Sequence, residues 1–289
     1  MQVFEKIADL QAWLADQRRE GKTIGFAPTM GALHEGHLSL VRAAEAAGDV
    51  PVVSIFVNPR QFNDPEDLRK YPRMPEHDQA LLQRANCQAL FMPDVDEVYP
   101  PGQDISVKLD FGHLTQVMEG EFRPGHFEGM ATVVKRLLDI VAPQRLYMGQ
   151  KDFQQLTIVR EMIRRLALPV ELVMCPTVRE ADGLAMSSRN LRLSLEMRAA
   201  APVIFQALEE ARAAFASGIT ADSLRQRAFE RMQQAGLRPE YFDIVDGYTL
   251  LPVPSVKDAP FVVACTAAWA GDVRLIDNVV LQGQPGTSL

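Results

Sequence analysis

Short apolar runs alternate with longer segments of helical spacing in the first part of the chain, and this alternation limits the possible folds more than any other feature. Residues 23–27 and 51–57 are apolar runs, and residues 36–47 between them have helical spacing and end at Gly48. The run 51–57 is β-branched and apolar on both faces, as a central parallel strand is. These segments predict a strand–helix–strand unit with parallel strands.

The alternation continues along the chain to Pro176. We expect further strands at residues 89–92, 145–148 and 171–174, and helices at residues 75–85, 129–141 and 152–166. The acidic opening, MQVFEKIADLQAWLADQ, is expected to begin an amphipathic helix and not a secretory signal, and residues 93–102 to form a loop. Repeated units of this kind predict an α/β fold with a Rossmann-like, doubly wound parallel sheet.

The pattern changes after Pro176. Helices are expected at residues 196–216 and 221–235, followed by β-rich stretches at 241–245, 261–268 and 273–280. Helices followed by strands predict a smaller C-terminal α+β domain. We divide the chain into domains at residues 1–176 and 177–281, and expect the polar tail 282–289 to be disordered.

Charge and composition exclude several classes of function. The 30 Lys and Arg residues and 37 Asp and Glu residues give a net charge of −7, which argues against a nucleic-acid partner. The longest apolar runs fall far short of the ~20 residues that a membrane span needs. Cys87, Cys175 and Cys265 show no CxxC pairing and lie in or near apolar stretches, which favours buried, reduced thiols in a cytoplasmic protein.

The segment PTMGALHEGH, residues 28–37, lies directly between the first strand and the first helix. Ligands of open α/β sheets bind at the carboxyl ends of strands, and the start of a helix offers free N–H groups to phosphate. Gly31 and Gly36 permit a close backbone approach, and His34 and His37 share one helix face. Two imidazoles placed there can donate to phosphate oxygens. The segment is neither a P-loop nor a dinucleotide fingerprint, and a metal-binding histidine pair would lack an obvious third ligand.

A second candidate segment, GQKD at residues 149–152, also lies between a predicted strand and a predicted helix. Lys151 can reach phosphates as a mobile charge, although taken alone it would be a solvated lysine. Asp152 is either part of the site or the N-cap of the following helix. One of Gln154 and Gln155, which open that helix, is expected to face the pocket.

A third candidate, MSSRN at residues 186–190, follows an Asp-Gly turn. Ser187, Ser188 and Arg189 can together bind an oxyanion, through two neutral hydroxyl donors and one charged guanidinium. The alternative is an exposed turn that caps the next helix. No GxSxG motif is present, so a hydrolase nucleophile is not expected.

Two weaker candidates complete the set. Gln61, in NPRQFNDPEDLRKY at residues 58–71, is suited to holding a small polar substrate, in a long loop that is either a lid or a solvated connector. Arg123 and His126, in FRPGHF, could bind a carboxylate or form only a turn. We expect the remaining histidines, His77 and His113, to lie at the surface.

These motifs carry a resemblance to a known family. HEGH after the first strand, with the later MSSR, resembles the HxGH and KMSKS-like pair of the nucleotidyltransferase superfamily. More specifically, the chain resembles the pantothenate synthetases, or pantoate–β-alanine ligases. The segments that match this family occur in the family's order: PTMGALHEGHLSLV, IFVNPRQF, YPR, FRPGHFEGM, GQKDFQQL and TVREADGLAMSSRN. The resemblance implies that ATP, D-pantoate and β-alanine are condensed to pantothenate, AMP and pyrophosphate through a pantoyl adenylate.

The resemblance also implies a role for each motif residue. The catalytic residues would be His34, His37, Lys151, Ser187, Ser188 and Arg189. Of these, His37 would act mainly by hydrogen-bond donation, because pyrophosphate hardly needs protonation to leave. The ATP site would comprise Met30, Gly31, Ala32, Leu33, His34, Glu35, Gly36, His37, Gly149, Gln150, Lys151, Asp152, Val178, Met186, Ser187, Ser188 and Arg189. Val178 would meet the adenine by its backbone.

The acid and amine substrates and the metal ion complete the implied site. Gln61 and Gln155 would hold pantoate, with Arg123 and His126 as further contacts of pantoate or β-alanine. Mg²⁺ is expected with the nucleotide, bound mostly through phosphate and water, with Asp78 as a contact through water. The family resemblance further implies a homodimer, and a C-terminal domain that acts as a lid over the nucleotide.

Two other functions remain as alternatives. A nucleotidyltransferase acting on a phosphorylated acceptor would keep HxGH but would not require β-alanine. A catalytically inactive nucleotide sensor would be favoured by loss of His37, Lys151 or Arg189, and all three are present.

Overall fold

The computed structural model of the chain describes residues 1–62, 65–255 and 258–284. Its larger part is built on a parallel sheet of six strands in the order β1-β4-β3-β2-β5-β6. The strands are β1 (Gln2–Phe4), β2 (Ile24–Thr29), β3 (Val50–Ile55), β4 (Ala89–Phe91), β5 (Arg145–Gly149) and β6 (Glu171–Cys175). The chain adds strands outward from β2 to β4 and then returns to place β5 on the other side of β2. The carboxyl ends of β2 and β5 therefore form the switch point at which such sheets bind ligands.

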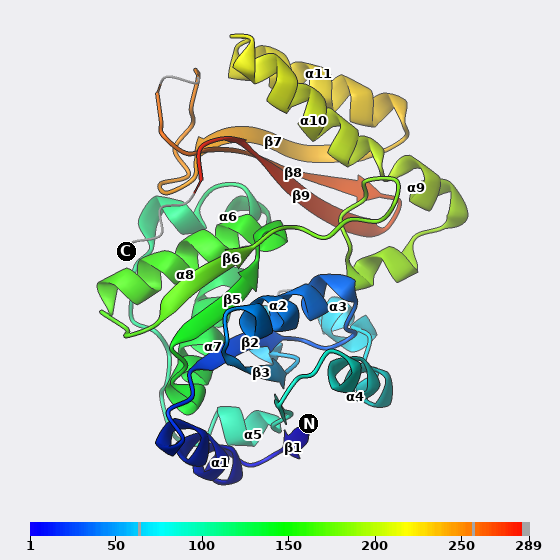
Figure 1. Cartoon of the computed structure of the whole chain (residues 1–289). Coiled ribbons are helices and arrows are strands. Elements are labelled where there is room, and N and C mark those ends of the chain that lie inside the picture. Colours follow the sequence, from blue (N-terminus) through cyan, green and yellow to red (C-terminus); the bar gives the residue numbers. More distant parts are fainter. Residues whose placement is uncertain (63–64, 256–257, 285–289) are drawn as a thin grey trace.

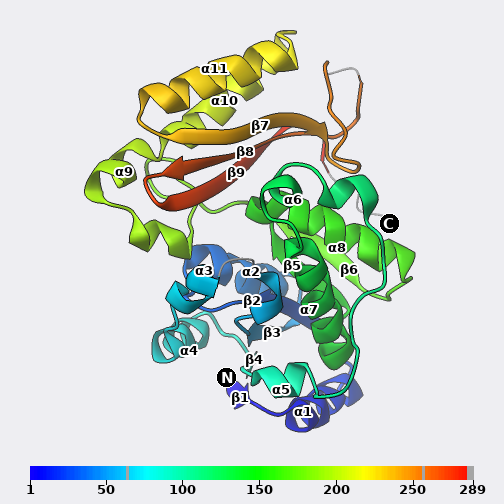
Figure 2. The same cartoon turned by 180° about the vertical axis from the view of Figure 1, so that it is seen from behind.

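Helices cover both faces of this sheet (Figures 1 and 2). One face packs against α1 (Ile7–Arg19), α7 (His126–Val141) and α8 (Phe153–Arg165), and the other against α2 (Glu35–Ala46) and α4 (Pro75–Arg84). Successive strand residues alternate between the two cores: Phe26 and Val52 join the first, whereas Ala27 and Val53 join the second. Strands that are apolar on both faces therefore lie in the middle of the layers, which confirms the predicted doubly wound fold.

A smaller antiparallel sheet follows, in the order β7-β8-β9. Its strands are β7 (Arg238–Asp246), β8 (Val262–Ala270) and β9 (Val273–Gln282). One face packs against α10 (Val203–Ala216) and α11 (Ala221–Gln234), as Figure 1 shows. The other face, through Tyr241, Val263 and Cys265, belongs to the same hydrophobic core as α7 and α8. The two sheets thus share a core, and the proposed division at residue 176 remains a prediction.

Several expectations about local structure are wrong. The chain begins with β1, which was not expected, ahead of the helix expected in the opening residues, which is present as α1; the predicted helix at 196–216 is two helices, α9 (Leu195–Ala200) and α10. The break falls at Ala201 and Pro202, because proline lacks the N–H that a continuous helix would use. The predicted loop at 93–102 contains a short helix, α5 (Val95–Val98). In the tail, β9 extends to Gln282, and residues 285–289 lie outside the described residues.

The segment at residues 58–71 contains more regular structure than a loop. It comprises the 3-10 turn η1 (Pro59–Gln61) and the helix α3 (Pro65–Lys70), and residues 63–64 lie outside the described residues. The short helix α6 (Glu119–Phe122) precedes α7, and further 3-10 turns are η2 (Gly112–Thr115), η3 (Gln150–Asp152) and η4 (Ser188–Arg192). A lid movement of the 58–71 segment remains a prediction.

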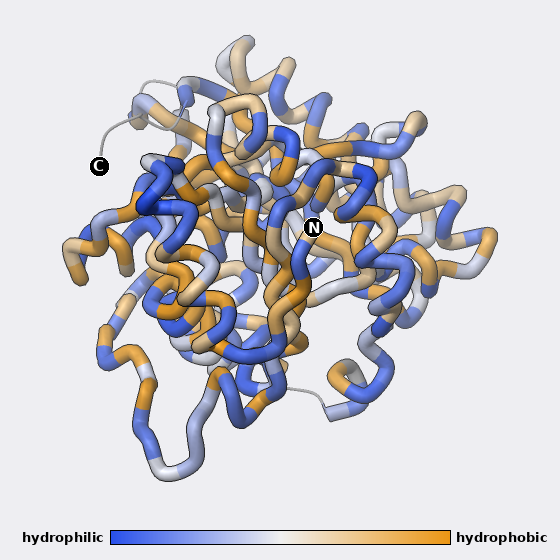
Figure 3. Tube along the Cα trace, turned by 60° about the horizontal axis from the view of Figure 1, so that its bottom comes forward, coloured by the Kyte–Doolittle hydropathy of each residue, from blue (hydrophilic) through white to orange (hydrophobic). Residues whose placement is uncertain are grey.

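Two expectations from composition can be compared with the structure. All three cysteines are free and buried, as predicted. Hydrophobic and hydrophilic residues alternate along the chain trace (Figure 3), and across the described ranges every helix is too short or too polar to cross a lipid bilayer.

Candidate active site

The predicted segments meet in one cleft at the switch point. A cavity of about 210 Å³ is lined by residues from every one of them. The predicted residues in its wall are Met30, His34, Gly36, His37, Gln61, Arg123, His126, Gly149, Lys151, Asp152, Gln155, Val178, Met186, Ser187, Ser188 and Arg189. A second cavity, of about 470 Å³, opens toward β9 and shares Arg123, Lys151, Asp152, Ser187 and Arg189 with the first. The convergence follows from the fold, since β2 and β5 end side by side.

The two histidines of HEGH are fixed by the start of α2. The Nδ1 atom of His34 accepts from the Gly36 N–H at 3.1 Å, and the Nδ1 atom of His37 accepts from the His34 N–H at 3.3 Å. Because each Nδ1 is an acceptor, the proton of each neutral ring is on Nε2. The ring centroids are 4.1 Å apart, and a Cβ at Gly36 would approach His34 Cε1 to 2.8 Å. A side chain at position 36 would therefore displace the His34 ring.

Both imidazoles are neutral near pH 7. Burial, with a further contribution from Lys151, lowers the pKa of His34 to about 4. Burial, the neighbouring His34 and then Lys151 lower the pKa of His37 to about 3. A neutral imidazole with its proton on Nε2 is a hydrogen-bond donor, not a source of positive charge. The pair thus fits hydrogen-bond donation to an anion better than proton transfer.

Asp78 supports the loop before these histidines. Its carboxylate accepts from the backbone N–H groups of Ala32 at 2.9 Å and Leu33 at 2.7 Å, and it is 1% exposed. Gly31 and Ala32 both have positive φ angles, +83° and +49°, which alanine seldom adopts. The two hydrogen bonds hold this strained turn, so Asp78 is a positioning residue. A contact with Mg²⁺ through water remains a prediction.

Lys151 occupies the turn η3, and its backbone is held by the antiparallel sheet. The Asn278 side-chain amide on β9 donates to the carbonyl groups of Gln150 and Lys151, both at 2.9 Å. The Gln150 side chain donates back to Asn278 at 3.0 Å. Asp152 takes the N-cap position of α8, but among the described residues its side chain makes no capping hydrogen bond and lies 3.8 Å from the Lys151 ammonium. Capping of α8 therefore does not explain why an aspartate stands at position 152.

The Asp-Gly turn before the MSSRN segment is held by a salt bridge to β9. The Arg179 guanidinium donates to both oxygens of Asp277, at 2.6 and 3.0 Å, and to the Gly183 carbonyl at 3.1 Å. Ser187 caps η4, because its Oγ accepts from the Arg189 N–H at 3.2 Å, and it also lines both cavities. The capping alternative and the site assignment are therefore compatible.

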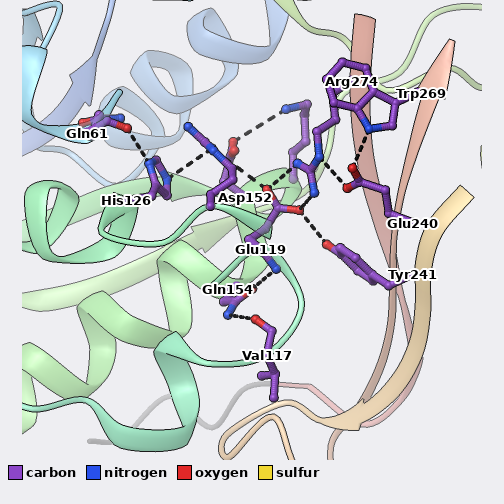
Figure 4. A network of polar contacts seen from close by, with 12 residues as sticks. Gln61, Val117, Glu119, His126, Asp152, Gln154, Glu240, Tyr241, Trp269 and Arg274 are labelled. Carbon is purple, nitrogen blue, oxygen red and sulfur yellow. Dashed lines mark hydrogen bonds and ion pairs between the residues drawn. The ribbon is translucent and has the colours of Figure 1, made fainter. Parts of the chain in front are cut away.

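The side chain of Gln61 is oriented by Asn58. The Asn58 amide donates to Gln61 Oε1 at 3.0 Å and to the Gly129 carbonyl at 3.1 Å, while Tyr99 Oη donates to Asn58 Oδ1 at 2.7 Å. With its oxygen engaged, Gln61 has its Nε2 donors left for a ligand. The His126 ring contacts the Gln61 carbonyl through Nδ1 at 2.8 Å (Figure 4).

Some predicted residues lie elsewhere. Gly31, Ala32, Leu33, Glu35, Gln150 and Asp78 are not in the walls of the two cavities. Glu35 forms an exposed ion pair with Arg42 at 2.7 Å. Gln154 is buried and donates to the Leu114 and Val117 carbonyls, so Gln155 is the glutamine that faces the cleft. His77 and His113 are exposed, as expected.

Comparison with known proteins identifies the family. The sequence pattern of the family described as pantoate-beta-alanine ligase matches residues 2–280. The chain belongs to this family. Pantothenate synthetase of Porphyromonas gingivalis W83 is 48% identical over 280 residues, which are 96% of this chain and 99% of that protein. Pantothenate synthetase of Bacteroides thetaiotaomicron is 49% identical over 280 residues, which are 96% and 98% of the two chains.

Solved structures of the pantoate–β-alanine ligase family agree with the fold. The crystal structure of pantothenate synthetase from Thermus thermophilus has a TM-score of 0.91 and 44% identity, covering 98% of this chain and all of that one. The Francisella tularensis pantoate-beta-alanine ligase, complexed with beta-gamma ATP and beta-alanine, has a TM-score of 0.80 and 31% identity, covering 99% of this chain and all of that one. The chain is therefore a ligase of this family.

The ligase site includes residues that sequence reasoning missed. Asn58, Asp277 and Asn278 hold the motif residues but belong to no predicted site. The one available signal for the last two was a polar pair inside the apolar run VRLIDNVVL of β9. A buried polar pair in a strand must be hydrogen-bonded, which marks it as part of a network.

The residues present could hold a magnesium ion only together with the phosphates of a bound nucleotide. Throughout the described residues, no group of three or more His, Cys, Asp or Glu side chains could hold a metal ion. Both Asp78 oxygens already accept backbone N–H groups, and Asp152 is the carboxylate beside Lys151 in the cleft. Such a site suits Mg²⁺, which keeps several waters and binds substrate phosphates.

Proposed function

We propose that this ligase condenses D-pantoate with β-alanine at the expense of ATP, through a pantoyl adenylate, releasing AMP and pyrophosphate. The observation that carries the proposal is the neutral His34 and His37 pair, with its Nε2 protons as donors, in one cavity with Lys151, Ser188 and Arg189. Preorganised donors of this kind stabilise charge that develops on a phosphoryl group. The Francisella relative, bound to a nucleotide and β-alanine, supports the choice of substrates.

In the first step, a pantoate carboxylate oxygen attacks the α-phosphorus of ATP, and the bond to the β-phosphate oxygen breaks. Gln61 and Gln155 orient pantoate, while His34, His37, Lys151, Ser187, Ser188 and Arg189 bind the triphosphate oxygens. The chain forms no covalent intermediate, so its contribution is positioning and charge stabilisation. Mg²⁺, when bound, would neutralise phosphate charge.

In the second step, the β-alanine amine attacks the acyl carbon of the adenylate. The bond between that carbon and the phosphate oxygen breaks, AMP leaves, and the amine proton passes to solvent. Arg123, which lines both cavities, and His126, which lines the smaller one, would contact the acid or the amine substrate. The wider ATP-site assignments, the homodimer and the cytoplasmic location remain predictions.

Isotope transfer tests this sequence of steps. With pantoate labelled by ¹⁸O in its carboxylate, ATP, Mg²⁺ and β-alanine, we expect pantothenate and AMP in equal amounts, with one ¹⁸O in each AMP. Without β-alanine, labelled pyrophosphate should exchange into ATP only when pantoate is present. Formation of ADP and phosphate instead of AMP and pyrophosphate would show that the intermediate is an acyl phosphate and not an adenylate. An adenylylated product formed regardless of β-alanine would favour the nucleotidyltransferase alternative.

A further inference from the structure

A buried carboxylate outside every predicted motif joins α6 to the antiparallel sheet beside the cleft. Glu119, at the start of α6, is 7% exposed. It accepts from both Arg274 Nη atoms of β9, at 2.6 and 2.7 Å, and from Tyr241 Oη of β7 at 2.9 Å (Figure 4). Burial would raise the pKa of Glu119, but Arg274 outweighs this effect and lowers it. The group is therefore an ionised anchor between α6 and the antiparallel sheet.

The backbone around Glu119 is held just as closely. Its N–H donates to Gln154 Oε1 of α8 at 2.9 Å, and Met118 before it has a φ angle of +50°. A Cβ at Gly120 would lie 2.1 Å from the Thr115 carbonyl oxygen. A strained backbone angle at Met118 and a close backbone contact at Gly120 are kept only where the surrounding contacts hold the segment in place. The position of α6 is therefore fixed.

From Glu119 the contacts lead into the cleft. Arg123 Nη1 lies 4.0 Å from Glu119 Oε2 and 3.3 Å from His126 Nε2. His126 must be protonated on Nδ1, because that atom contacts the Gln61 carbonyl, which can only accept; Nε2 is then free to accept from Arg123. Burial and Arg123 lower the pKa of His126 to about 4, so the ring is a neutral link between Arg123 and the Gln61 turn.

We infer that Glu119 is a positioning residue for the acid substrate: its carboxylate holds Arg123, and Arg123 holds the Gln61 turn through His126. Arg274 sets the position of Glu119, so the antiparallel sheet is coupled to the pantoate side of the cleft. The HEGH pair is supported separately, by its own backbone and by Asp78. A change at Glu119 should therefore affect pantoate far more than ATP. The inference rests on the proposed function for the identity of the acid.

The chain offers a matched control. Asp49, 6% exposed, accepts from Arg145 at 2.5 Å and from Tyr147 Oη at 2.7 Å, so its partners are the same in kind as those of Glu119. It precedes β3 and lies at the amino ends of the strands, away from the cleft. Asp49→Asn thus removes a comparable buried charge without touching Arg123.

Calorimetric binding of pantoate and of ATP, each alone, tests the inference. We expect Glu119→Gln to weaken pantoate binding about 10-fold and ATP binding less than about twofold, and Asp49→Asn to leave both within about twofold. Equal weakening of both ligands by Glu119→Gln, or no weakening of pantoate binding, would overturn the inference. Failure of the wild-type chain to bind pantoate would instead overturn the proposed function.

A double-mutant cycle separates positioning from a general loss of structure. In an Arg123→Gln background, Glu119→Gln should cause less than about a twofold further loss of pantoate affinity, because its route to Gln61 is already broken. The same 10-fold loss in both backgrounds would show that Glu119 does not act through Arg123. If Glu119→Gln does not fold, Arg274→Lys replaces it in the cycle, since lysine keeps the charge but lacks the two-pronged contact.

Discussion

Two buried carboxylates with similar partners lie at opposite edges of the parallel sheet. Asp49 at the amino edge is held by Arg145 and Tyr147, which both belong to β5. Glu119 beside the carboxyl edge is held by Arg274 and Tyr241 of the other sheet. The first set joins the start of β3 to β5, across the intervening β2 of one sheet, whereas the second joins α6 to the antiparallel sheet and continues to Arg123 in the cleft.

The comparison shows that the chemistry of a buried ion pair does not determine its role. Breaking such a pair by removing the carboxylate is costly wherever it lies, because the arginine loses its buried counterion and keeps only a second carboxylate, Glu171 or Glu240. Only the carboxyl edge of the sheet is next to the segments that carry His37, Lys151 and Gln61. We therefore expect changes at the carboxyl edge to alter catalysis or binding, and changes at the amino edge to alter stability alone.

The largest effect is expected for a cation in the cleft. Lys151→Ala should lower the rate of pyrophosphate release by about 10²–10³-fold, about 3–4 kcal/mol, which is the scale for losing one transition-state donor. The free energy of unfolding should change by less than about 1 kcal/mol, since the lysine pairs only loosely with Asp152. Kinetics and urea unfolding measure the two quantities. Lys135→Ala, which breaks an ion pair with Asp139 on α7, is the control, and near-normal release in Lys151→Ala would refute the assignment.

The amino edge should give the opposite result. Asp49→Asn is expected to lower the free energy of unfolding by about 2 kcal/mol, because the amide keeps one acceptor oxygen but turns an N–H group toward the other donor, and Arg145 keeps only Glu171 as a counterion. The turnover of the folded variant should stay within about twofold of wild type. Urea unfolding followed by assays at a temperature where the variant is folded would measure both. A tenfold loss of turnover would show that the two edges are not separable.

Much of the fold and most of the candidate site could be predicted locally. The segments PTMGALHEGH, GQKD and MSSRN each follow an element that the hydrophobic pattern predicts, and strands that end side by side bring their loops together. Three-residue β1 was missed because so short a strand has no measurable period. The residues that hold the site were missed because they are distant: Asn278 contacts Lys151 across 127 positions of sequence. Periodicity within a segment carries no information about such contacts.

A smaller effect is expected at Asp78, which is at the carboxyl edge but only supports the site. Asp78→Asn turns one acceptor into a donor that faces the Ala32 or Leu33 N–H, so the loop before His34 should shift. We expect turnover to fall about 10-fold, about 1.4 kcal/mol. Asp49→Asn is the same chemical change at the other edge and serves as the control. A defect that disappears as the magnesium concentration rises would assign Asp78 to the metal instead of the loop.

The smallest effect is the dependence of stability on pH that the histidine pair should cause. Burial, with His34 and Lys151, lowers the pKa of His37 to about 3 in the folded chain, against about 6.5 for an unfolded histidine. As the pH falls below about 6.5, the unfolded chain takes up a proton at His37 that the folded chain does not. The free energy of unfolding is therefore unaffected by this histidine above that pH and decreases as the pH falls toward about 3. His37→Asn removes this uptake. Between about pH 6.5 and 5.5 the wild-type chain should therefore lose about 1 kcal/mol more than the variant, and above about pH 7.5 the two should run parallel. The free energy of unfolding of both proteins would be measured by denaturant unfolding at each pH. If it falls equally in both between about pH 6.5 and 5.5, His37 is as easily protonated in the folded chain as in the unfolded one. That result would remove the argument for a neutral donor in the cleft.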